Sequence, residues 1–189
     1  MKRKIKIGLD FDGVVAYNPF RVIRYPVAWF KKKVLKKKGL SFFIPKTWWQ
    51  KGVWMIIHGV SIFPALGSAR VIEMSRDGRF EFHLITGRLG FLGRQTEGWL
   101  EKYGLRKSFA SININTDCHQ PHLFKEKLMK NLKLDYYIED NLDVVEYIKN
   151  KGKTKVLWVY NIVDRGWKYE NKFPSLKSAL EYVEKNHPV

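Results

Sequence analysis

The stretch KIKIGLDFDG, residues 4–13, decides the fold of this protein. Its first six residues alternate loosely between apolar and other side chains, which is typical of a buried β-strand. The strand ends at an acidic turn that contains Asp10 and Asp12 and closes at Gly13. In sheets of parallel strands, ligands bind beyond the carboxyl ends of the strands. This turn is therefore the first place in the chain where we expect chemistry.

Similar apolar segments recur further along the chain, and helical patterns separate them. We expect strands at residues 80–85, 109–114, 136–138 and 155–160, and helices at residues 89–103, 122–132, 142–150 and 175–186. Polar clusters follow three of the five strands, after Leu9, Ile85 and Ile138. This alternation predicts an α/β fold with a Rossmann-like, mostly parallel sheet flanked by helices.

One segment, residues 15–63, interrupts the alternation and has a composition of its own. It contains ten Lys or Arg and no Asp or Glu. Within it, residues 19–38 carry apolar side chains at helical spacing, and Pro26 predicts that this helix is bent or broken. The apolar run at residues 53–67 is too short to span a bilayer, and we expect it to belong to the core.

The chain is strongly basic, because 35 Lys and Arg oppose 18 Asp and Glu and give a net charge of +17. A field of this sign favours anionic partners, namely phosphorylated small molecules, nucleic acid or lipid head groups. A hydrophobic content of 45% excludes the composition of a disordered chain.

The single cysteine, Cys118, excludes an intramolecular disulfide and a thiolate zinc site. We expect it to be a small buried residue, and its solitary presence fits a cytoplasmic setting. The apolar stretch near the start is interrupted by Asp10 and Asp12, so we expect no cleavable signal peptide.

The acidic residues predict phosphoryl chemistry that depends on a divalent cation. A carboxylate that attacks phosphate meets charge repulsion, which a cation between the two groups relieves. Asp10 and the later pair Glu139 and Asp140 offer the hard oxygen ligands that Mg²⁺ prefers. Asp12 is placed to handle the proton of the leaving group, and Thr86 can bind phosphate oxygens.

Four motifs, in this order, resemble those of the haloacid dehalogenase (HAD) superfamily of phosphatases. They are GLDFDGV at residues 8–14, LITGR at residues 84–88, Lys125, and YIEDN at residues 137–141. Lys127 is an alternative for the third motif, and we prefer Lys125 from its distance to the fourth. In that family, an insertion after the first motif forms a cap that closes over the site and selects the substrate.

The resemblance implies an aspartyl-phosphate mechanism and a role for each motif residue. The catalytic residues would be Asp10 and Asp12, the phosphate-binding residues Thr86, Gly87 and Lys125, and the metal ligands Asp10, Asp12, Asp140 and, through a water, Glu139. It also divides the chain into a catalytic core, residues 1–14 and 64–189, and a small, mainly helical, basic and aromatic-rich cap, residues 15–63.

Three roles stay open at this level. The first is a magnesium-dependent phosphatase that hydrolyses a phosphomonoester, with a polyanionic substrate favoured by the net charge. The second is a phosphotransferase or mutase of the same fold, whereas dehalogenation leaves Asp12 without a task. The third is a binding module whose basic cap engages nucleic acid or an anionic membrane, which would place the protein peripherally at a membrane. The presence of Asp10, Asp12 and Asp140 together favours an enzyme.

The histidines show no metal-binding spacing. His83 falls in a predicted strand, so we expect it to be packed. His119 and His122 flank Pro121 and are weaker candidates for lining the site.

Overall fold

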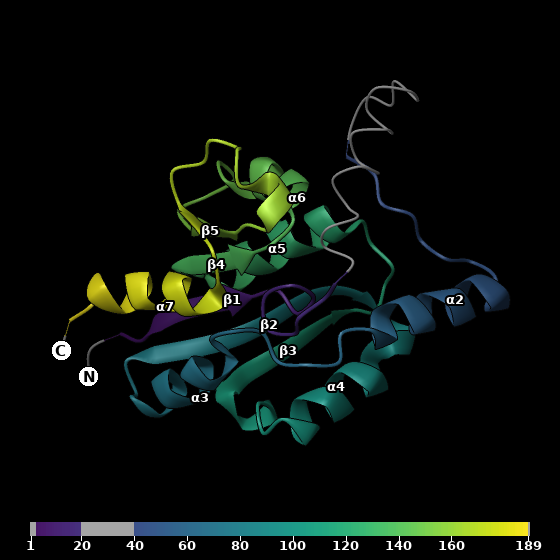
Figure 1. The fold of residues 1–189 in the computed structure, drawn as a ribbon, viewed down its shortest axis with the longest axis horizontal. Coiled ribbons are helices and arrows are strands. Elements are labelled where there is room, and N and C mark those ends of the chain that lie inside the picture. Colours follow the sequence, from purple (N-terminus) through teal and green to yellow (C-terminus); the bar gives the residue numbers. More distant parts are fainter. Residues whose placement is uncertain (1–2, 20–39, 189) are drawn as a thin grey trace.

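The computed structural model describes residues 3–19 and 40–188. The bent helix expected at residues 19–38 falls, apart from its first residue, outside the described residues. Among those described, a single six-stranded sheet organises the molecule, and helices cover both of its faces (Figure 1).

All the pairings in the sheet are parallel, and the first strand lies near its middle. The order across the sheet is β3-β2-β1-β4-β5-β6. The strands are β1 (Ile5–Leu9), β2 (Phe80–Leu89), β3 (Phe109–Asn115), β4 (Tyr136–Glu139), β5 (Lys155–Val159) and β6 (Lys172–Phe173). The five strands expected from the sequence are confirmed, and β6 is an addition at the edge.

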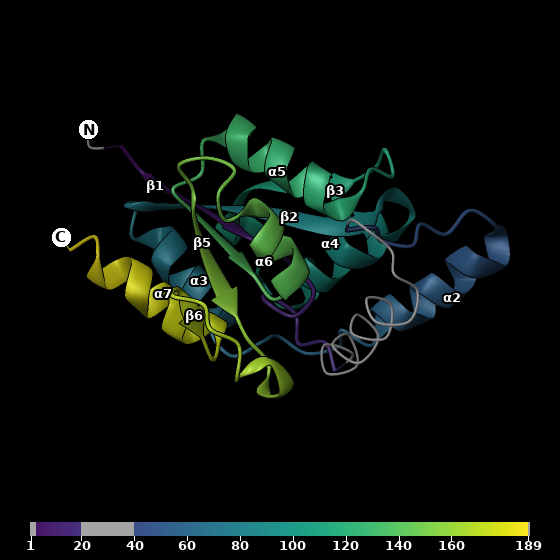
Figure 2. The same cartoon turned by 90° about the horizontal axis from the view of Figure 1, so that it is seen from above.

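The helices connect successive strands, and one long helix belongs to the insertion (Figure 2). The α-helices are α2 (Trp48–Gly59), α3 (Ser68–Arg76), α4 (Gly93–Lys102), α5 (Pro121–Leu132), α6 (Leu142–Ile148) and α7 (Leu176–Lys185). Short 3-10 helices are η1 (Gly90–Leu92), η2 (Arg106–Ser108) and η3 (Ile162–Asp164). The sequence predicted α4, α5, α6 and α7, but it did not predict α3.

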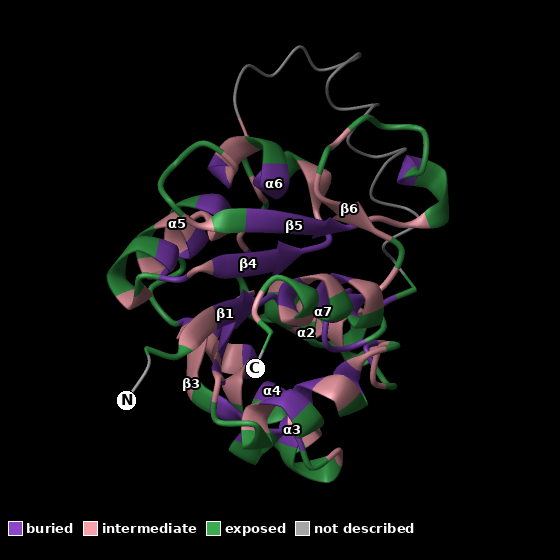
Figure 3. Cartoon of the chain, turned by 90° about the vertical axis from the view of Figure 1, so that its left-hand side faces the viewer, coloured by how far each residue is buried: buried purple, intermediate pink, exposed green. Residues whose placement is uncertain are grey.

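The core has two parts, one on each face of the sheet, because successive strand residues point to opposite faces. On one face, Leu9 and Leu84 pack with residues of α3, α4 and α7. On the other, Tyr137 and Trp158 pack with residues of α5 and α6. Figure 3 shows the resulting concentration of buried residues in β1, β4 and β5. Both faces are covered, so the strands are apolar nearly throughout.

Gly8 leaves room beside β1 for the side chains of Leu134 and Tyr137. A Cβ atom at this position would lie 2.5 Å from Leu134 Cδ1 and 2.7 Å from Tyr137 Cδ2. Gly8 therefore faces the α5 side of the sheet. Two residues later, Asp10 follows the same alternation and points to that side, where Lys125 lies.

The insertion leaves and rejoins the core at one place. Tyr17 N donates a hydrogen bond to Phe63 O at 2.8 Å, and Ala65 N donates to Val15 O at 2.9 Å. Ala16 and Pro64 form an antiparallel bridge between these two bonds. We call these paired residues, 15–17 and 63–65, the neck.

The apolar run at residues 53–67 is not core, so that expectation was wrong. Ile56, Phe63 and Leu66 are 74%, 64% and 71% exposed, and α2 buries none of its residues. Cys118 is exposed too, contrary to expectation, and lies in the turn after β3 with a φ of 53°. Among the described residues, none of the helices combines the length and apolar character that crossing a membrane requires.

Candidate active site

The motif residues meet at the carboxyl edge of the sheet. β1 lies between β2 and β4, and Leu9 is in register with Leu84 on one side and Ile138 on the other. The next residue, Asp10, donates its backbone N–H to Ile138 O at 3.0 Å. The ends of three strands that are distant in the sequence therefore lie side by side.

Three carboxylates form a buried cluster at this edge. Asp10, Glu139 and Asp140 each place an oxygen within 4.8 Å of the others, and all three side chains are buried. Asp140 is held through its backbone, because its carbonyl accepts a 3.1 Å hydrogen bond from Trp158 Nε1. A compact set of hard oxygen donors is the chemistry that Mg²⁺ requires, so these residues fit such an ion.

Lys125 supplies a positive charge inside the cluster. Its Nζ lies 3.1 Å from Asp10 Oδ1 and 2.7 Å from Glu139 Oε2. The lysine is buried in α5, whereas Lys127, the alternative in the sequence, is exposed. One ammonium against three carboxylates still leaves the cluster negative, which is a second reason why a cation fits.

This crowding changes the proton affinity of the groups involved. Burial and then the nearby Glu139 carboxylate raise the pKa of Asp10 well above its ordinary value, and Lys125 offsets this only in part. Burial alone would lower the pKa of Lys125, but Asp10 and Glu139 raise it above the ordinary value, so the lysine stays charged.

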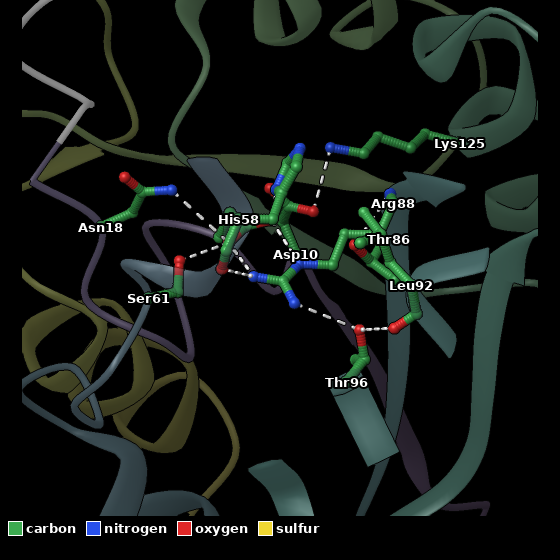
Figure 4. Close-up of polar contacts among 10 residues, drawn as sticks. Asp10, Asn18, His58, Ser61, Thr86, Arg88, Leu92, Thr96 and Lys125 are labelled. Carbon is green, nitrogen blue, oxygen red and sulfur yellow. Dashed lines mark hydrogen bonds and ion pairs between the residues drawn. The ribbon is translucent and has the colours of Figure 1, made fainter. Parts of the chain in front are cut away.

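Asp12 lies outside the carboxylate cluster and has a different environment. Arg88 forms a bidentate ion pair with it, through Nε at 2.8 Å and Nη2 at 2.7 Å. Ser61 Oγ donates to the same carboxylate at 2.6 Å, and His58 Nδ1 lies 3.2 Å from it. Asn18 is more distant, at 3.5 Å. Figure 4 shows these side chains converging from separate segments.

The pKa of Asp12 moves in the opposite direction from that of Asp10. Burial would raise it, but the charge and hydrogen bonds of Arg88, with a further contribution from His58, bring the pKa of Asp12 well below its ordinary value. Its carboxylate is thus ionised and engaged by Arg88. A direct metal contact by this side chain, which the motif had suggested, would require Asp12 to leave Arg88.

Arg88 is itself fixed by several neighbours. Its guanidinium donates to His58 O at 2.8 Å and to Thr96 Oγ1 at 3.3 Å, and it lies 4.4 Å from the centre of the Phe11 ring. With 3% of its surface exposed, this arginine is a buried structural partner of Asp12.

The second motif approaches the start of α5. Thr86 is buried, and its Oγ1 accepts a hydrogen bond from Arg88 N at 3.1 Å. At Gly87, a Cβ atom would lie 3.1 Å from Pro121 Cβ, so the close approach of β2 to α5 leaves little room for a side chain there. Gly87 and Lys125 are therefore close neighbours at the carboxylate cluster.

Sequence reasoning missed the partners of Asp12. Arg88 was visible in the LITGR motif, but no role was assigned to it. His58 and Ser61 belong to the insertion, 46 and 49 residues from Asp12, and no spacing in the sequence links them to it. A buried carboxylate needs a polar or charged partner. This requirement was the only signal in the sequence that residues such as Arg88, His58 and Ser61 contact Asp12.

The other histidines have structural surroundings. His83 is buried and within hydrogen-bonding distance of Ser111 and Glu81, as expected for a packed residue. His122 packs against the rings of Phe42 and Tyr147, and His119 is exposed.

Comparisons with known proteins give structural matches alone, because no protein-family model and no curated protein sequence matches the chain. CbbY from Rhodobacter sphaeroides, solved with phosphate, has a TM-score of 0.60 at 13% identity, over 95% of this chain and 100% of that one. A haloacid dehalogenase-like hydrolase from Streptococcus pneumoniae has a TM-score of 0.58 at 11% identity, over 96% and 99%. The HAD hydrolase YfnB from Bacillus subtilis, bound to magnesium, has a TM-score of 0.57 at 12% identity, over 96% and 99%. These similarities extend over nearly the whole chain, and they show that the protein has the fold of the haloacid dehalogenase superfamily.

Proposed function

We propose that this protein is a magnesium-dependent phosphatase that hydrolyses a phosphomonoester through an aspartyl-phosphate on Asp10. The observation that carries the proposal is the pairing of two unlike carboxylates at the end of β1. Asp10 lies in a buried cluster with Glu139, Asp140 and Lys125, whereas Asp12 is held apart by Arg88. One carboxylate is thus available for attack and the other for proton transfer.

In the first half-reaction, an Asp10 oxygen forms a bond to phosphorus while the bond from phosphorus to the leaving oxygen breaks. Mg²⁺ held by Asp10 and Asp140, with Glu139 beside it, would screen the repulsion between the Asp10 carboxylate and the phosphate. Lys125 contributes a second positive charge beside the Asp10 carboxylate. It also favours the ionised form of Asp10, which the attack requires.

In the second half-reaction, water attacks the phosphorus atom, Asp12 accepts its proton, and the bond to Asp10 breaks. The ion pair with Arg88 keeps Asp12 in the basic form that this step needs. Donation of a proton to the leaving group in the first half-reaction is harder, because Arg88 opposes protonation of Asp12. We infer that Asp12 releases Arg88 when the substrate binds and keeps the proton that it took from water in the preceding turnover, which it then passes to the leaving oxygen.

The phosphate would be held by Thr86, by backbone N–H groups at Gly87 and by Lys125. Two structures of one neighbour support a phosphorylated ligand, since CbbY was solved with phosphate and, as a variant, with xylulose 1,5-bisphosphate. The magnesium in YfnB supports the choice of ion. The positive net charge favours a substrate with more than one negative group.

A mutase or phosphotransferase is the second candidate, because a β-phosphoglucomutase from Thermotoga maritima is also a structural neighbour, with a TM-score of 0.57. The two activities differ in the acceptor of the phosphoryl group from Asp10. Release of inorganic phosphate in the absence of any added acceptor distinguishes hydrolysis from transfer.

The deciding experiment is a screen of phosphorylated metabolites and p-nitrophenyl phosphate, with Mg²⁺ and with a chelator. We expect phosphate release that vanishes in chelator, returns with Mg²⁺ and is inhibited by Ca²⁺, which accepts looser coordination. A folded Asp10→Asn variant should be inactive, and Asp117→Asn, which changes an exposed carboxylate, should match the wild type. Turnover by Asp10→Asn, or full activity in chelator, would refute the mechanism.

A further inference from the structure

We propose that α2 and the residues next to it form a docking surface for an anionic lipid bilayer. The first observation is where the exposed apolar side chains gather. Of fourteen large exposed hydrophobic residues in the described part of the chain, nine lie between residues 43 and 66. They are Phe43, Trp48, Trp49, Val53, Met55, Ile56, Ile62, Phe63 and Leu66. Such a concentration marks an interaction site, whereas single exposed apolar residues are ordinary.

The second observation is that α2 is turned the opposite way from an ordinary surface helix. His58 contacts Asp12 and Trp54 packs on His58, so this side faces the core. At about 100° per residue, a second side carries the exposed residues Trp48, Trp49, Val53 and Ile56. The apolar side therefore faces away from the protein.

The charged residues within this stretch are of one sign. Residues 40–66 contain Lys46 and Lys51, both exposed, and no Asp or Glu. A bilayer that contains anionic lipids offers an apolar interior beneath a negative surface, and it complements this arrangement in both respects. Tryptophan is the side chain enriched at that boundary.

Other occupants fit less well. In a two-fold dimer the same patch meets itself, so the lysines of one copy would oppose those of the other. Nucleic acid is bound by basic side chains that track phosphates, with aromatic rings that stack on bases. Here the outward side of α2 also carries aliphatic residues, Val53 and Ile56, which have no such partner in nucleic acid. Figures 1 and 2 both place α2 at one end of the molecule, where a flat surface can reach it.

The test is flotation of the full-length protein with vesicles of phosphatidylcholine alone or mixed with phosphatidylglycerol. We expect binding to the anionic vesicles, weakened by salt. The variant Trp48→Ser/Ile56→Ser should bind them at least about tenfold less well, because burial of one large apolar side chain accounts for that much. The control, Leu123→Ser/Ile162→Ser, removes two exposed apolar side chains outside this surface, 48% and 80% exposed, and should bind as the wild type does.

Several results would overturn the proposal. One is that wild-type protein floats with neither kind of vesicle, or equally with both. Another is that the wild type forms a concentration-dependent dimer or binds an oligonucleotide, and the Trp48→Ser/Ile56→Ser variant loses that property but still binds vesicles. Circular dichroism of each variant excludes misfolding. Turnover of p-nitrophenyl phosphate, which needs no docking, should be equal in all of them, so a failure here is distinct from a failure of the catalytic proposal.

Discussion

Asp10 and Asp12 are separated by one residue, and their carboxyl groups have opposite surroundings. Burial and Glu139 raise the pKa of Asp10. Burial works in the same direction at Asp12, but Arg88 and His58 reverse the result and lower its pKa. Two carboxyl groups whose pKa values are driven apart can take different parts in one reaction. At this scale, the site depends on what surrounds each carboxylate more than on the motif itself.

Replacing Asp10 with Asn should stabilise the metal-free protein while it abolishes activity. Because the folded-state pKa of Asp10 is raised, its ionisation costs stability as the pH rises above the ordinary Asp value of about 3.9. The amide removes that cost, so Tm in chelator at pH 7 should rise, by about 2–4 °C for each kcal/mol gained. The gain should shrink as the pH is lowered towards 4. A lower Tm for Asp10→Asn than for Asp117→Asn would contradict this.

Removing only one member of the ion pair between Asp12 and Arg88 should strongly lower the stability of the protein. Arg88→Gln leaves a buried carboxylate without its main partner, and we expect a loss of about 3–5 kcal/mol, or roughly 6–20 °C in Tm. The double variant Asp12→Asn/Arg88→Gln should recover part of that loss. The stability due to Asp12 is present above its unfolded pKa and disappears as the pH falls through its lower folded pKa.

The control for this pair is Arg94→Gln, which changes an exposed arginine of α4 and should leave Tm within about 1 °C. Urea unfolding curves of the wild type, Asp12→Asn, Arg88→Gln and the double variant give the coupling free energy directly. Strict additivity of the single variants would show that Asp12 and Arg88 do not act as a pair.

At the scale of elements, the packing of β1 against Leu134, which follows α5, and Tyr137 of β4 helps to fix where Asp10 lies relative to Lys125. Gly8→Ala inserts a methyl group against Leu134 and Tyr137, so we expect a destabilisation of about 1–3 kcal/mol. It should also lower turnover, because the shift moves Asp10. Gly152→Ala, where nothing lies within 4 Å of the added Cβ, should leave both stability and turnover near wild type. Equal effects of the two substitutions, in thermal unfolding and in a phosphatase assay, would count against this account.

The elements of the core could be predicted from the sequence because both faces of the sheet are covered. Strands buried on two sides are short apolar runs, and β1, β2 and β4 carry such runs up to their polar ends. The motif residues at those ends do come together, as Asp10, Lys125 and Glu139 illustrate. By contrast, α3 buries only Val71 and Met74 among its apolar residues, and β6 has only two residues, so neither has a distinct pattern.

The insertion could not be predicted in the same way. The apolar run at residues 53–67 was interpreted as core, yet Ile56 and Leu66 are largely exposed. Hydrophobicity indicates that burial of a side chain is energetically favourable, but it does not indicate whether the core or another molecule buries that side chain. For the same reason, the contacts of His58 and Ser61 with Asp12 join two segments that no local pattern connects.

At the scale of the whole molecule, the neck brings the two ends of the insertion together. We propose that residues 15–63 are a cap and that residues 1–14 and 64–189 fold without it. Replacing residues 18–62 by Asn-Gly joins Tyr17 to Phe63 by a tight turn that suits their antiparallel pairing.

The shortened protein should unfold cooperatively and lose binding to anionic vesicles. It should keep the ion pair of Arg88 with Asp12 and lose the contacts from Ser61 and His58, so we expect weakened turnover of p-nitrophenyl phosphate. Thermal unfolding followed by circular dichroism checks the folding. A product without a cooperative transition would show that the core depends on the insertion.

Of the six strands described, β1 is synthesised before the other five, and it occupies the middle of the finished sheet. Ile7 is in register with Phe82 on one side and with Tyr136 on the other. At ribosomal rates of about 5–20 residues per second, β4 follows β1 after roughly 10 s. β2 can cover one edge of β1 earlier, but the edge that pairs with β4 lacks its partner throughout this interval, and pairing over such separations is slow. The nascent chain therefore needs this edge of the apolar strand β1 to be shielded until Tyr136 has left the ribosome.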